Sequence, residues 1–145
     1  MIKMTREEVI KKLEEYKSDK SISFVDVDFR GVDLSNLDFS QVQFFNVIFD
    51  NNCLHHVTFT QSHFQNVVFY NCALFSVLFT YATFLHCNFT QSHIVTTDFG
   101  GTSIENSSFR RAHFTIVDFS DSTIIDSDFK GARVFSASFS DCKFK

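Results

Sequence analysis

The sequence predicts an all-β solenoid, a four-sided β-helix of about six coils with an N-terminal α-helical cap. Three observations predict it: a large apolar residue at every fifth position from Phe24 to Phe144, a second pattern with a period of twenty, and a charged segment at the start that breaks both periods. A spacing of five fits neither the 3.6-residue period of a helix nor the two-residue period of a strand. We therefore expect a repeat architecture, with a capping helix in residues 1–20 and the solenoid in residues 21–145.

The five-residue period runs without a slip over twenty-five positions, here called centres, and each centre holds a large apolar residue. Eighteen of the 21 Phe are centres, and the other three directly follow one. No inserted loop or linker interrupts the repeat, which indicates one continuous domain. We expect the two columns of centres that are Phe throughout to form the structural core: Phe29, Phe39, Phe49, Phe59, Phe69, Phe79, Phe89, Phe99, Phe109, Phe119, Phe129 and Phe139.

Each five-residue unit predicts a short strand followed by a corner. The residue two before a centre is usually small, as at Cys72, Ala82 and Ala112. Alternate side chains of an extended segment share a face, so this small residue and the centre point inward while the residue between them points outward. The last two residues turn the chain, and they are rich in turn formers, such as "GG" at 100–101.

The number of sides per coil follows from where Phe is replaced. Aliphatic centres recur at steps of twenty, at Leu34, Leu54, Leu74, Ile94 and Val134, interrupted only by Phe114. A coil of twenty residues with four sides explains this column, because stacked neighbours in a core must match in volume. Coils stacked at the spacing of paired strands, about 4.8 Å, form a rod in which each coil contacts only its neighbours.

These units resemble the pentapeptide repeat family, whose pattern is a small residue, Asp or Asn, Leu or Phe, and two variable residues. The closest matches are "VDLSN" at 32–36, "LDFSQ" at 37–41, "TDFGG" at 97–101, "VDFSD" at 117–121 and "SDFKG" at 127–131. The resemblance covers residues 22–145 and implies a right-handed quadrilateral β-helix. The sequence departs from the family pattern in having mostly Phe centres and often Val for Ala, which suggests a wider core.

Residues 4–19 predict an α-helix. Thr5 and Glu8 have the spacing of a capping box, and Glu7 with Lys11 and Glu8 with Lys12 have i to i+4 spacing. One face carries the apolar residues Val9, Ile10, Leu13 and Tyr16. We expect this face to cover the first coil, because an open solenoid end exposes strand edges and core rings. The alternative is a disordered charged tail.

No pattern in the sequence predicts catalysis, a cofactor or a metal site. Phosphate-binding glycine loops and the HExxH motif are absent. His93 and His113 lie twenty apart and should stack outward on adjacent coils, but two nitrogens are too few for a metal and Arg133 next in the column would repel one. The four Cys have no metal-ligand spacing and indicate small core or surface residues in a reducing compartment. Without a signal peptide or a bilayer-length apolar run, we expect a soluble cytoplasmic protein.

Two functional hypotheses from different classes remain. Some proteins that resemble this one protect type II topoisomerases such as gyrase by imitating DNA, which requires carboxylates along the whole rod. Here no residue from 51 to 97 carries a formal charge, leaving a neutral belt of more than two coils. The preferred hypothesis is a non-enzymatic structural or interaction rod that binds an unknown protein partner, without direct nucleic-acid or membrane binding.

The candidate interface consists of two columns of outward apolar residues, Phe45, Leu85 and Ile125 in one and Phe75, Val95 and Phe135 in the other. Exposed apolar columns of this kind are typical of contact surfaces. The simpler alternative is that each of these side chains only half-buries along a corner.

The C-terminal end of the rod differs from the N-terminal end. Phe144 is a centre with no further coil after it, so we expect a homodimer through the C-terminal coil, with Phe135 in the contact. Lys143 and Lys145 leave the opposite possibility open, because charges at an edge discourage pairing.

Overall fold

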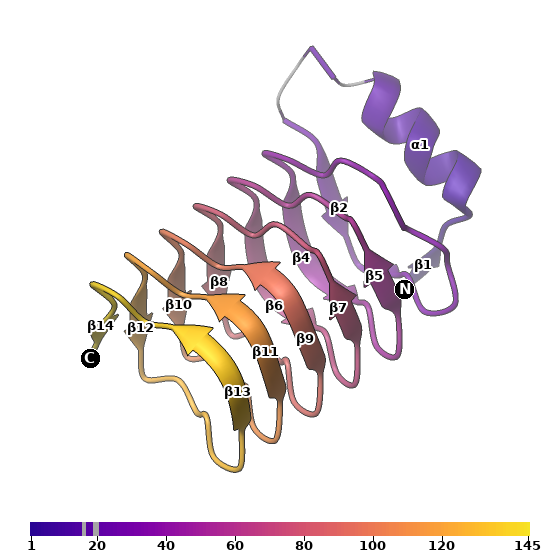
Figure 1. Ribbon diagram of the computed structural model, residues 1–145. Helices are drawn as coiled ribbons and strands as arrows, with labels where there is room; N and C mark the ends of the chain where they lie inside the picture. The colour runs from indigo at the N-terminus through magenta and orange to yellow at the C-terminus, as the bar shows by residue number, and fades with distance from the viewer. Residues whose placement is uncertain (16, 19–20) are drawn as a thin grey trace.

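The computed structural model describes residues 1–15, 17–18 and 21–145, which form a parallel four-sided β-solenoid of about six turns with one short helix at its N-terminal end (Figure 1). The elements are β1 (Ile2–Lys3), α1 (Arg6–Glu15), β2 (Ser23–Val25), β3 (Val27–Asp28), β4 (Gln43–Ile48), β5 (Cys53–His55), β6 (His63–Val68), β7 (Ala73–Phe75), β8 (Thr83–Leu85), β9 (His93–Asp98), β10 (Ser103–Glu105), β11 (His113–Asp118), β12 (Thr123–Ile125), β13 (Arg133–Ser138) and β14 (Lys143–Phe144).

The strand pairs of the described residues are parallel, and pairs between consecutive coils are in register at a step of twenty residues, apart from one shift between β11 and β13, where Thr115 lies opposite Ser136. A nine-stranded sheet runs β1-β3-β4-β6-β8-β10-β12-β14, with β2 also paired to β4, and a five-stranded sheet runs β13-β11-β9-β7-β5. In the second sheet Leu54 lies opposite Leu74, which lies opposite Ile94. Single bridges such as Leu78 to Asp98 and Asn88 to Ser108 tie the remaining two sides. The predicted four-sided coil of twenty residues is confirmed.

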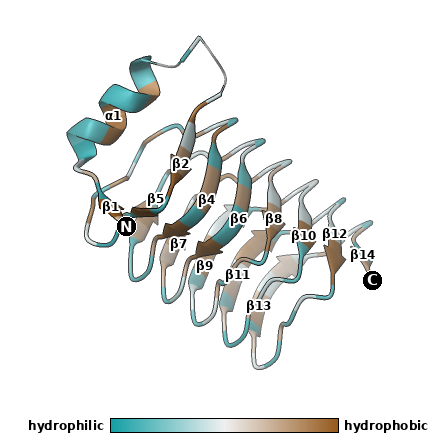
Figure 2. Cartoon of the chain, turned by 180° about the vertical axis from the view of Figure 1, so that it is seen from behind, coloured by the Kyte–Doolittle hydropathy of each residue, from teal (hydrophilic) through white to brown (hydrophobic). Residues whose placement is uncertain are grey.

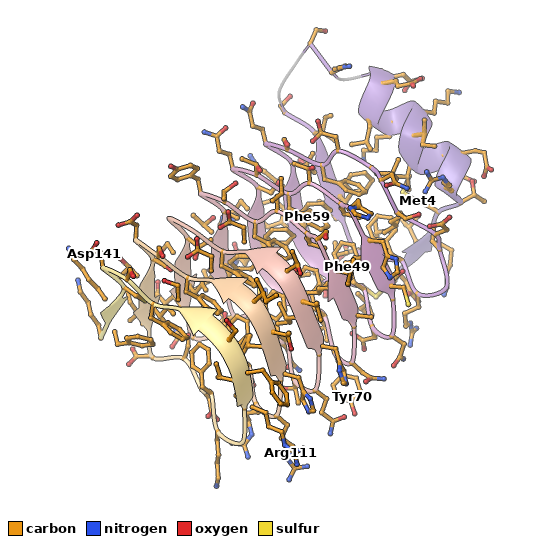
Figure 3. The ribbon with its side chains drawn as sticks, in the orientation of Figure 1. Met4, Phe49, Phe59, Tyr70, Arg111 and Asp141 are labelled. Atoms are coloured by element: carbon orange, nitrogen blue, oxygen red, sulfur yellow. The ribbon has the colours of Figure 1, made fainter. Side chains whose placement is uncertain are left out.

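The core is a set of stacked Phe columns. The rings of Phe49 and Phe69 lie 4.8 Å apart and 3° from parallel, and those of Phe59 and Phe79 lie 5.1 Å apart at 5°. Figure 3 shows Phe49 and Phe59 inside the coils. Every centre from Phe24 to Ile124 is buried. The prediction is therefore confirmed for these centres.

The predicted core is only partly buried at its C-terminal end. Phe129 and Phe139 are only partly buried, and Val134 and Phe144 are exposed. The reason is geometric: a side chain in the solenoid is covered by the coils before and after it, and the described residues place no coil beyond Phe144.

Small residues two before the centres are buried and satisfy the backbone of the adjoining coil. The Ser62 hydroxyl donates to the carbonyl of Phe39 at 2.6 Å, and the Cys72 thiol lies 3.1 Å from the carbonyl of Phe49. In the described residues no buried side-chain nitrogen or oxygen lacks a hydrogen-bond partner. Tight turns can therefore be buried without the cost of unpaired polar groups.

The corners are made by left-handed backbone at the second residue after a centre. Twenty non-glycine residues of the described ranges have positive φ, and most are Asn, Asp, Gln or His, which tolerate that region better than other side chains do. In the corner column from Asp26 to Asp126, one hydrogen bond joins neighbouring side chains of the described residues, from Asn46 to Asp26. The left-handed backbone conformation, more than hydrogen bonding between stacked side chains, explains why Asn and Asp occupy this column.

The N-terminal end contains a strand that the sequence pattern does not predict. β1 pairs with β3, so that Ile2 lies opposite Val27 and Lys3 opposite Asp28. Two residues are too few to show a period, and the pairing depends on the free edge of the first coil. The capping segment is thus a strand followed by a helix that starts at Arg6.

Helix α1 lies over the first coil, and its surface alternates between polar and apolar bands (Figure 2). Thr5 caps it, because its hydroxyl accepts a hydrogen bond from the backbone of Glu8 at 3.2 Å. Val9 is fully buried and Leu13 packs against the core. Tyr16, expected on the same face, lies outside the described residues.

Two expected ion pairs on α1 are replaced by other contacts. In the described residues, Lys11 lies 4.0 Å from Glu15 rather than pairing with Glu7, and the Lys12 ammonium lies 4.7 Å above the Phe24 ring rather than on Glu8. Covering an aromatic ring with a cation stabilises the docked helix more than an exposed ion pair would.

Candidate protein-binding surface

The two predicted interface columns lie at opposite corners of the rod. Phe45, Leu85 and Ile125 belong to β4, β8 and β12 of the nine-stranded sheet, whereas Phe75, Val95 and Phe135 belong to β7, β9 and β13 of the five-stranded sheet. The columns are offset by ten residues, which is half a coil. One partner face cannot contact both columns without wrapping around the rod.

The six residues also differ in exposure. Phe75 is 43% exposed and Phe135 is 75% exposed, but Phe45, Leu85, Val95 and Ile125 are only half-buried along their corners. Phe45 is partly covered by the His63 ring at 5.7 Å. The structure therefore favours the Phe75 column as the more accessible of the two.

Four apolar side chains lie around the corner that contains Phe75, and we call this set the apolar corner patch. It consists of Phe75, Leu78, Val95 and Ile116. Val95 lies directly opposite Phe75 in the strand register, and Leu78 follows on the adjoining side of the same coil. Ile116 extends the patch by one coil, because it directly follows Thr115, which lies opposite Val95.

Ile116 is the residue of the patch that sequence reasoning missed. It is 61% exposed and stands at a left-handed corner position with φ of 56°. Where the structure describes a non-glycine residue with positive φ, only Ile116 and Thr96 are β-branched, and both lie at this same corner. A β-branched residue in that region is strained by about 1–2 kcal/mol. The signal available in the sequence was an Ile where other units have Asn, Asp or Gln.

The surroundings of the patch are polar and include two carboxylates. The His55 and His56 rings flank Phe75, at 5.7 Å and 6.2 Å between ring centroids. Asp98 and Asp118 lie along one border, on the coils that follow Leu78. An apolar centre with a polar rim is the usual anatomy of a protein interface.

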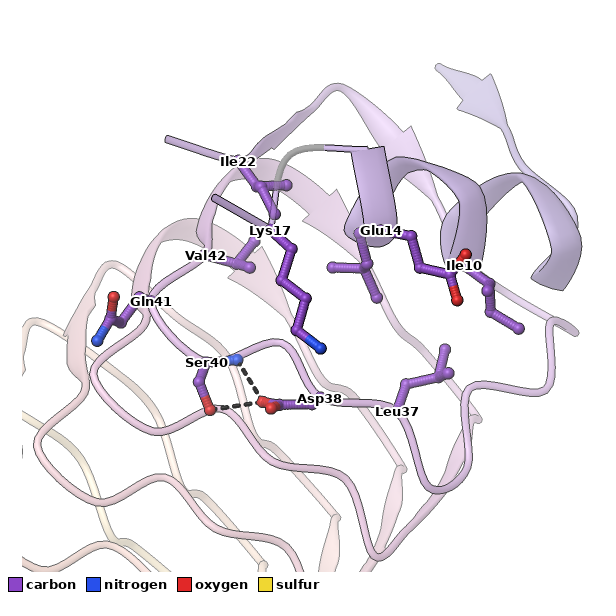
Figure 4. Close-up of a pocket in the computed structure, with 10 residues that line it drawn as sticks. Ile10, Glu14, Lys17, Ile22, Leu37, Asp38, Ser40, Gln41 and Val42 are labelled. Carbon is purple, nitrogen blue, oxygen red and sulfur yellow. Dashed lines mark hydrogen bonds between the residues drawn. The ribbon is translucent and has the colours of Figure 1, made fainter. Parts of the chain in front are cut away.

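A depression of about 360 Å³ lies beside α1, where the helix leaves part of the first coils uncovered (Figure 4). Ile10, Leu13 and Leu37 supply its apolar wall, and Glu14 and Lys17 lie at its rim. Asp38 is held in place by hydrogen bonds from the Ser40 backbone and hydroxyl. This hollow is a by-product of incomplete helix coverage, because its apolar wall is half the helix face and half the coil.

The described residues contain no cluster of three or more His, Cys, Asp or Glu that could hold a metal ion. Burial raises the pKa of the Cys72 and Cys87 thiols to about 12, which removes both as nucleophiles near neutral pH. Among the described residues, no helix has the length and apolar character that a bilayer span needs.

Family models for pentapeptide repeats match two segments, residues 22–61 and residues 79–123, together more than half of the chain. A pentapeptide repeat protein from the cyanobacterium Cyanothece 51142 has a similar solved structure, with a TM-score of 0.65 at 14% identity, over 94% of this chain and 99% of that one.

Two further solved structures match less closely. QnrB1, a plasmid-mediated fluoroquinolone resistance protein, gives a TM-score of 0.41 at 15% identity, over 84% of this chain and 72% of that one. HetL, a pentapeptide repeat protein involved in heterocyst differentiation regulation in Nostoc sp., gives 0.32 at 11% identity, over 97% and 94% of the two chains. No curated protein sequence matches the chain.

Proposed function

The chain belongs to the pentapeptide repeat proteins, and from this premise we propose that it is a non-enzymatic interaction rod that binds another protein through the apolar corner patch. The single observation that carries the proposal is Ile116, which is both strained and exposed. An Asn side chain at this position would relieve the backbone strain and would interact better with water. The stability of the free protein therefore does not explain why Ile is present. A protein partner that buries the Ile116 side chain does explain it.

The position of the patch supports the same proposal. Phe75 and Val95 form a flat aromatic and aliphatic surface on rigid β-structure, with no lysine or glutamate side chain among the residues between 51 and 97. Binding there costs little side-chain ordering, and the charged groups that would have to be desolvated are absent from the centre.

The alternative, a DNA-mimic protector or inhibitor of gyrase, is less well supported. Of the acids that could imitate phosphates, Asp28 pairs with Lys3 and Arg30, Asp33 with Arg6, and Asp128 with Arg110. The neutral belt further interrupts the charge along the rod. A DNA-binding groove recognises a continuous negative surface, which this rod lacks.

We also propose that the C-terminal end is covered by a second copy of the chain. Phe144 is 60% exposed, and Val134 and Phe135, on the opposite side of the last coil, are exposed as well. β13 and β14 each pair on one side only in the described residues. A two-fold contact would bury these rings and strand edges together.

The partner proposal is tested by co-purification from the cell of origin with two matched variants. In one, Phe75→Ser and Ile116→Asn remove the exposed apolar centre of the patch. In the other, Phe45→Ser and Leu85→Ser alter the opposite corner. We expect a partner retained by wild type and by the second variant and lost by the first. Equal retention by both variants would refute the patch as the binding surface.

The homodimer proposal is tested by light scattering at tens of micromolar protein. A mass near two chains that falls to one chain with Phe135→Asp supports it. A single-chain mass for wild type rejects it, and a dimer that survives the substitution moves the contact to the Phe45, Leu85 and Ile125 column.

A further inference from the structure

A groove with an unbalanced positive charge lies along another corner of the rod, between the side of the Asn88–Ser108 bridge and the side that contains β9, β11 and β13. It has a volume of about 480 Å³ and is lined by Asn71, Gln91, His93, Arg111, His113, Gly131 and Arg133. Figure 3 shows Tyr70 and Arg111 projecting from this corner, away from the core. No acidic side chain lines the groove.

Its arginines have no carboxylate partner among the described residues. The neighbouring Arg110 is paired with Asp128 at 2.8 Å, and Asp128 also accepts a hydrogen bond from the Lys130 backbone. The pKa of Asp128 is lowered by these contacts, so this carboxylate stays ionised and bound to Arg110 and the Lys130 backbone. Arg111 and Arg133 take part in no ion pair of the described residues. Their charge is available to a ligand.

The strand register stacks three basic groups on consecutive coils. His93 lies opposite His113, with 4.5 Å between ring centroids, and His113 lies opposite Arg133. The pKa of His113 is lowered by partial burial, then by His93 and Arg133. Such crowding of like charges destabilises the empty groove, and an anion between the groups would relieve it.

Two local features keep the groove open and shaped. Gly131 has φ of 74°, and a Cβ at that position would lie 3.2 Å from Arg111 Cγ, so glycine leaves room for the Arg111 side chain to lie over the next coil. The Tyr70 hydroxyl donates to Gln91 Oε1 at 2.9 Å, which directs the amide oxygen of Gln91 to Tyr70 and leaves its amino group without a partner in the described residues.

We propose that this groove binds a small doubly charged oxyanion, of the phosphate or phosphate-monoester class, between Arg111 and Arg133. Two planar guanidinium groups supply forked donors that match the oxygens of such an anion, and the Gln91 amide adds a neutral donor. The pKa of His113 is lowered from its ordinary value, and its protonation as the pH falls adds positive charge to the groove, so binding tightens at low pH. The charged or titratable groups that face the two rings are Arg111 and Arg133, both cationic throughout.

Isothermal titration with sulfate tests the proposal, because sulfate keeps its two charges between pH 5.5 and 8. Ionic strength is held constant with sodium chloride. We expect a dissociation constant in the millimolar range, at least threefold tighter at pH 5.5 than at pH 8. The double variant Arg111→Gln, Arg133→Gln should weaken binding at least tenfold, and the control Lys143→Gln, on the nine-stranded sheet, should not change it.

Phenyl phosphate and inorganic phosphate distinguish the source of the anion at pH 8. Tighter binding of phenyl phosphate assigns the groove to an organic monoester, and equal binding assigns it to the free anion. Equal loss of sulfate affinity in the arginine variant and the lysine control would mean diffuse charge attraction and overturn the proposal. Absence of binding at 20 mM sulfate would overturn it as well. Thermal unfolding without sulfate checks that the variants stay folded.

Discussion

The Lys3 ammonium lies 2.9 Å from Oδ2 of Asp28, a carboxylate whose side chain is only 4% exposed, and this contact fastens the N-terminal strand β1 to the first coil. Arg30 completes the arrangement with a forked contact to the same carboxylate, 2.7 Å from Nη2 and 3.0 Å from Nε. These hydrogen bonds hold the pKa of Asp28 far below its usual range.

Asp28→Asn should lower the free energy of unfolding by about 1–3 kcal/mol at pH 7, because a nearly buried carboxylate loses its charge-assisted hydrogen bonds. The folded-state pKa is lowered, so the contribution is complete above the unfolded value of about 3.9 and is lost as pH falls below it. Urea unfolding of both proteins from pH 6 to pH 2 should show the difference shrinking. The control Asp121→Asn, at an exposed left-handed corner, should change stability by less than about 0.5 kcal/mol. A constant difference down to pH 2 would contradict this.

Phe79→Ala should cost about 3–5 kcal/mol, because Phe79 is fully buried between the stacked rings of Phe59 and Phe99. The matched control is Phe135→Ala, where the ring is mostly exposed and the loss should stay below about 1 kcal/mol at low protein concentration. Chemical denaturation measures both. Equal losses would mean that burial in the stack does not set the energy.

Ile116→Asn should raise the free energy of unfolding by about 1 kcal/mol, because Asn tolerates left-handed backbone and the Ile side chain is largely exposed. The reverse change at the corresponding position of another corner, Asn106→Ile, should lower it by a similar amount. Thermal unfolding compares the two variants. A lower free energy of unfolding for Ile116→Asn would show that backbone strain at Ile116 does not destabilise the protein.

The four thiols should react in a set order with a thiol-specific reagent at pH 8. Cys53 is exposed and should react first, and Cys142, partly buried with its pKa raised by burial, should follow. Cys72 and Cys87, with pKa values of about 12, should react only after unfolding. Mass spectrometry of the time course identifies each site. Early labelling of Cys72 in native buffer would show that its coil opens locally.

Purified protein at micromolar concentration should not protect DNA supercoiling by gyrase against a quinolone, because the neutral belt and the paired acids break the negative surface. A supercoiling assay with a dose series measures this, and a known protecting protein serves as the positive control. Dose-dependent rescue by this chain would place the DNA-mimic function first.

Much of the candidate surface could be predicted because outward positions follow from the same period as the core. Phe75 and Phe135 were expected to be exposed, and they are. Ile116 was missed, because its exposure depends on a corner conformation that the centre pattern does not encode. The Arg111 and Arg133 groove was missed for a related reason: the residues come from two columns on either side of a corner, and only the folded corner brings them together.

The four-sided coil, the phase of the core and the step of twenty between neighbours follow from the residue pattern alone, because each residue of a solenoid contacts only the coils directly before and after it. The local period of the sequence therefore predicts which residues lie side by side in neighbouring coils, whereas in most other folds such contacts cannot be predicted from a local pattern. Tertiary structure alone decided what happens where that regularity ends. Asp28 is buried because Lys3 and Arg30 cover it. Phe129 and Phe139 are only partly buried because no described coil covers them. Burial at an end depends on what packs against it, which no repeat pattern specifies.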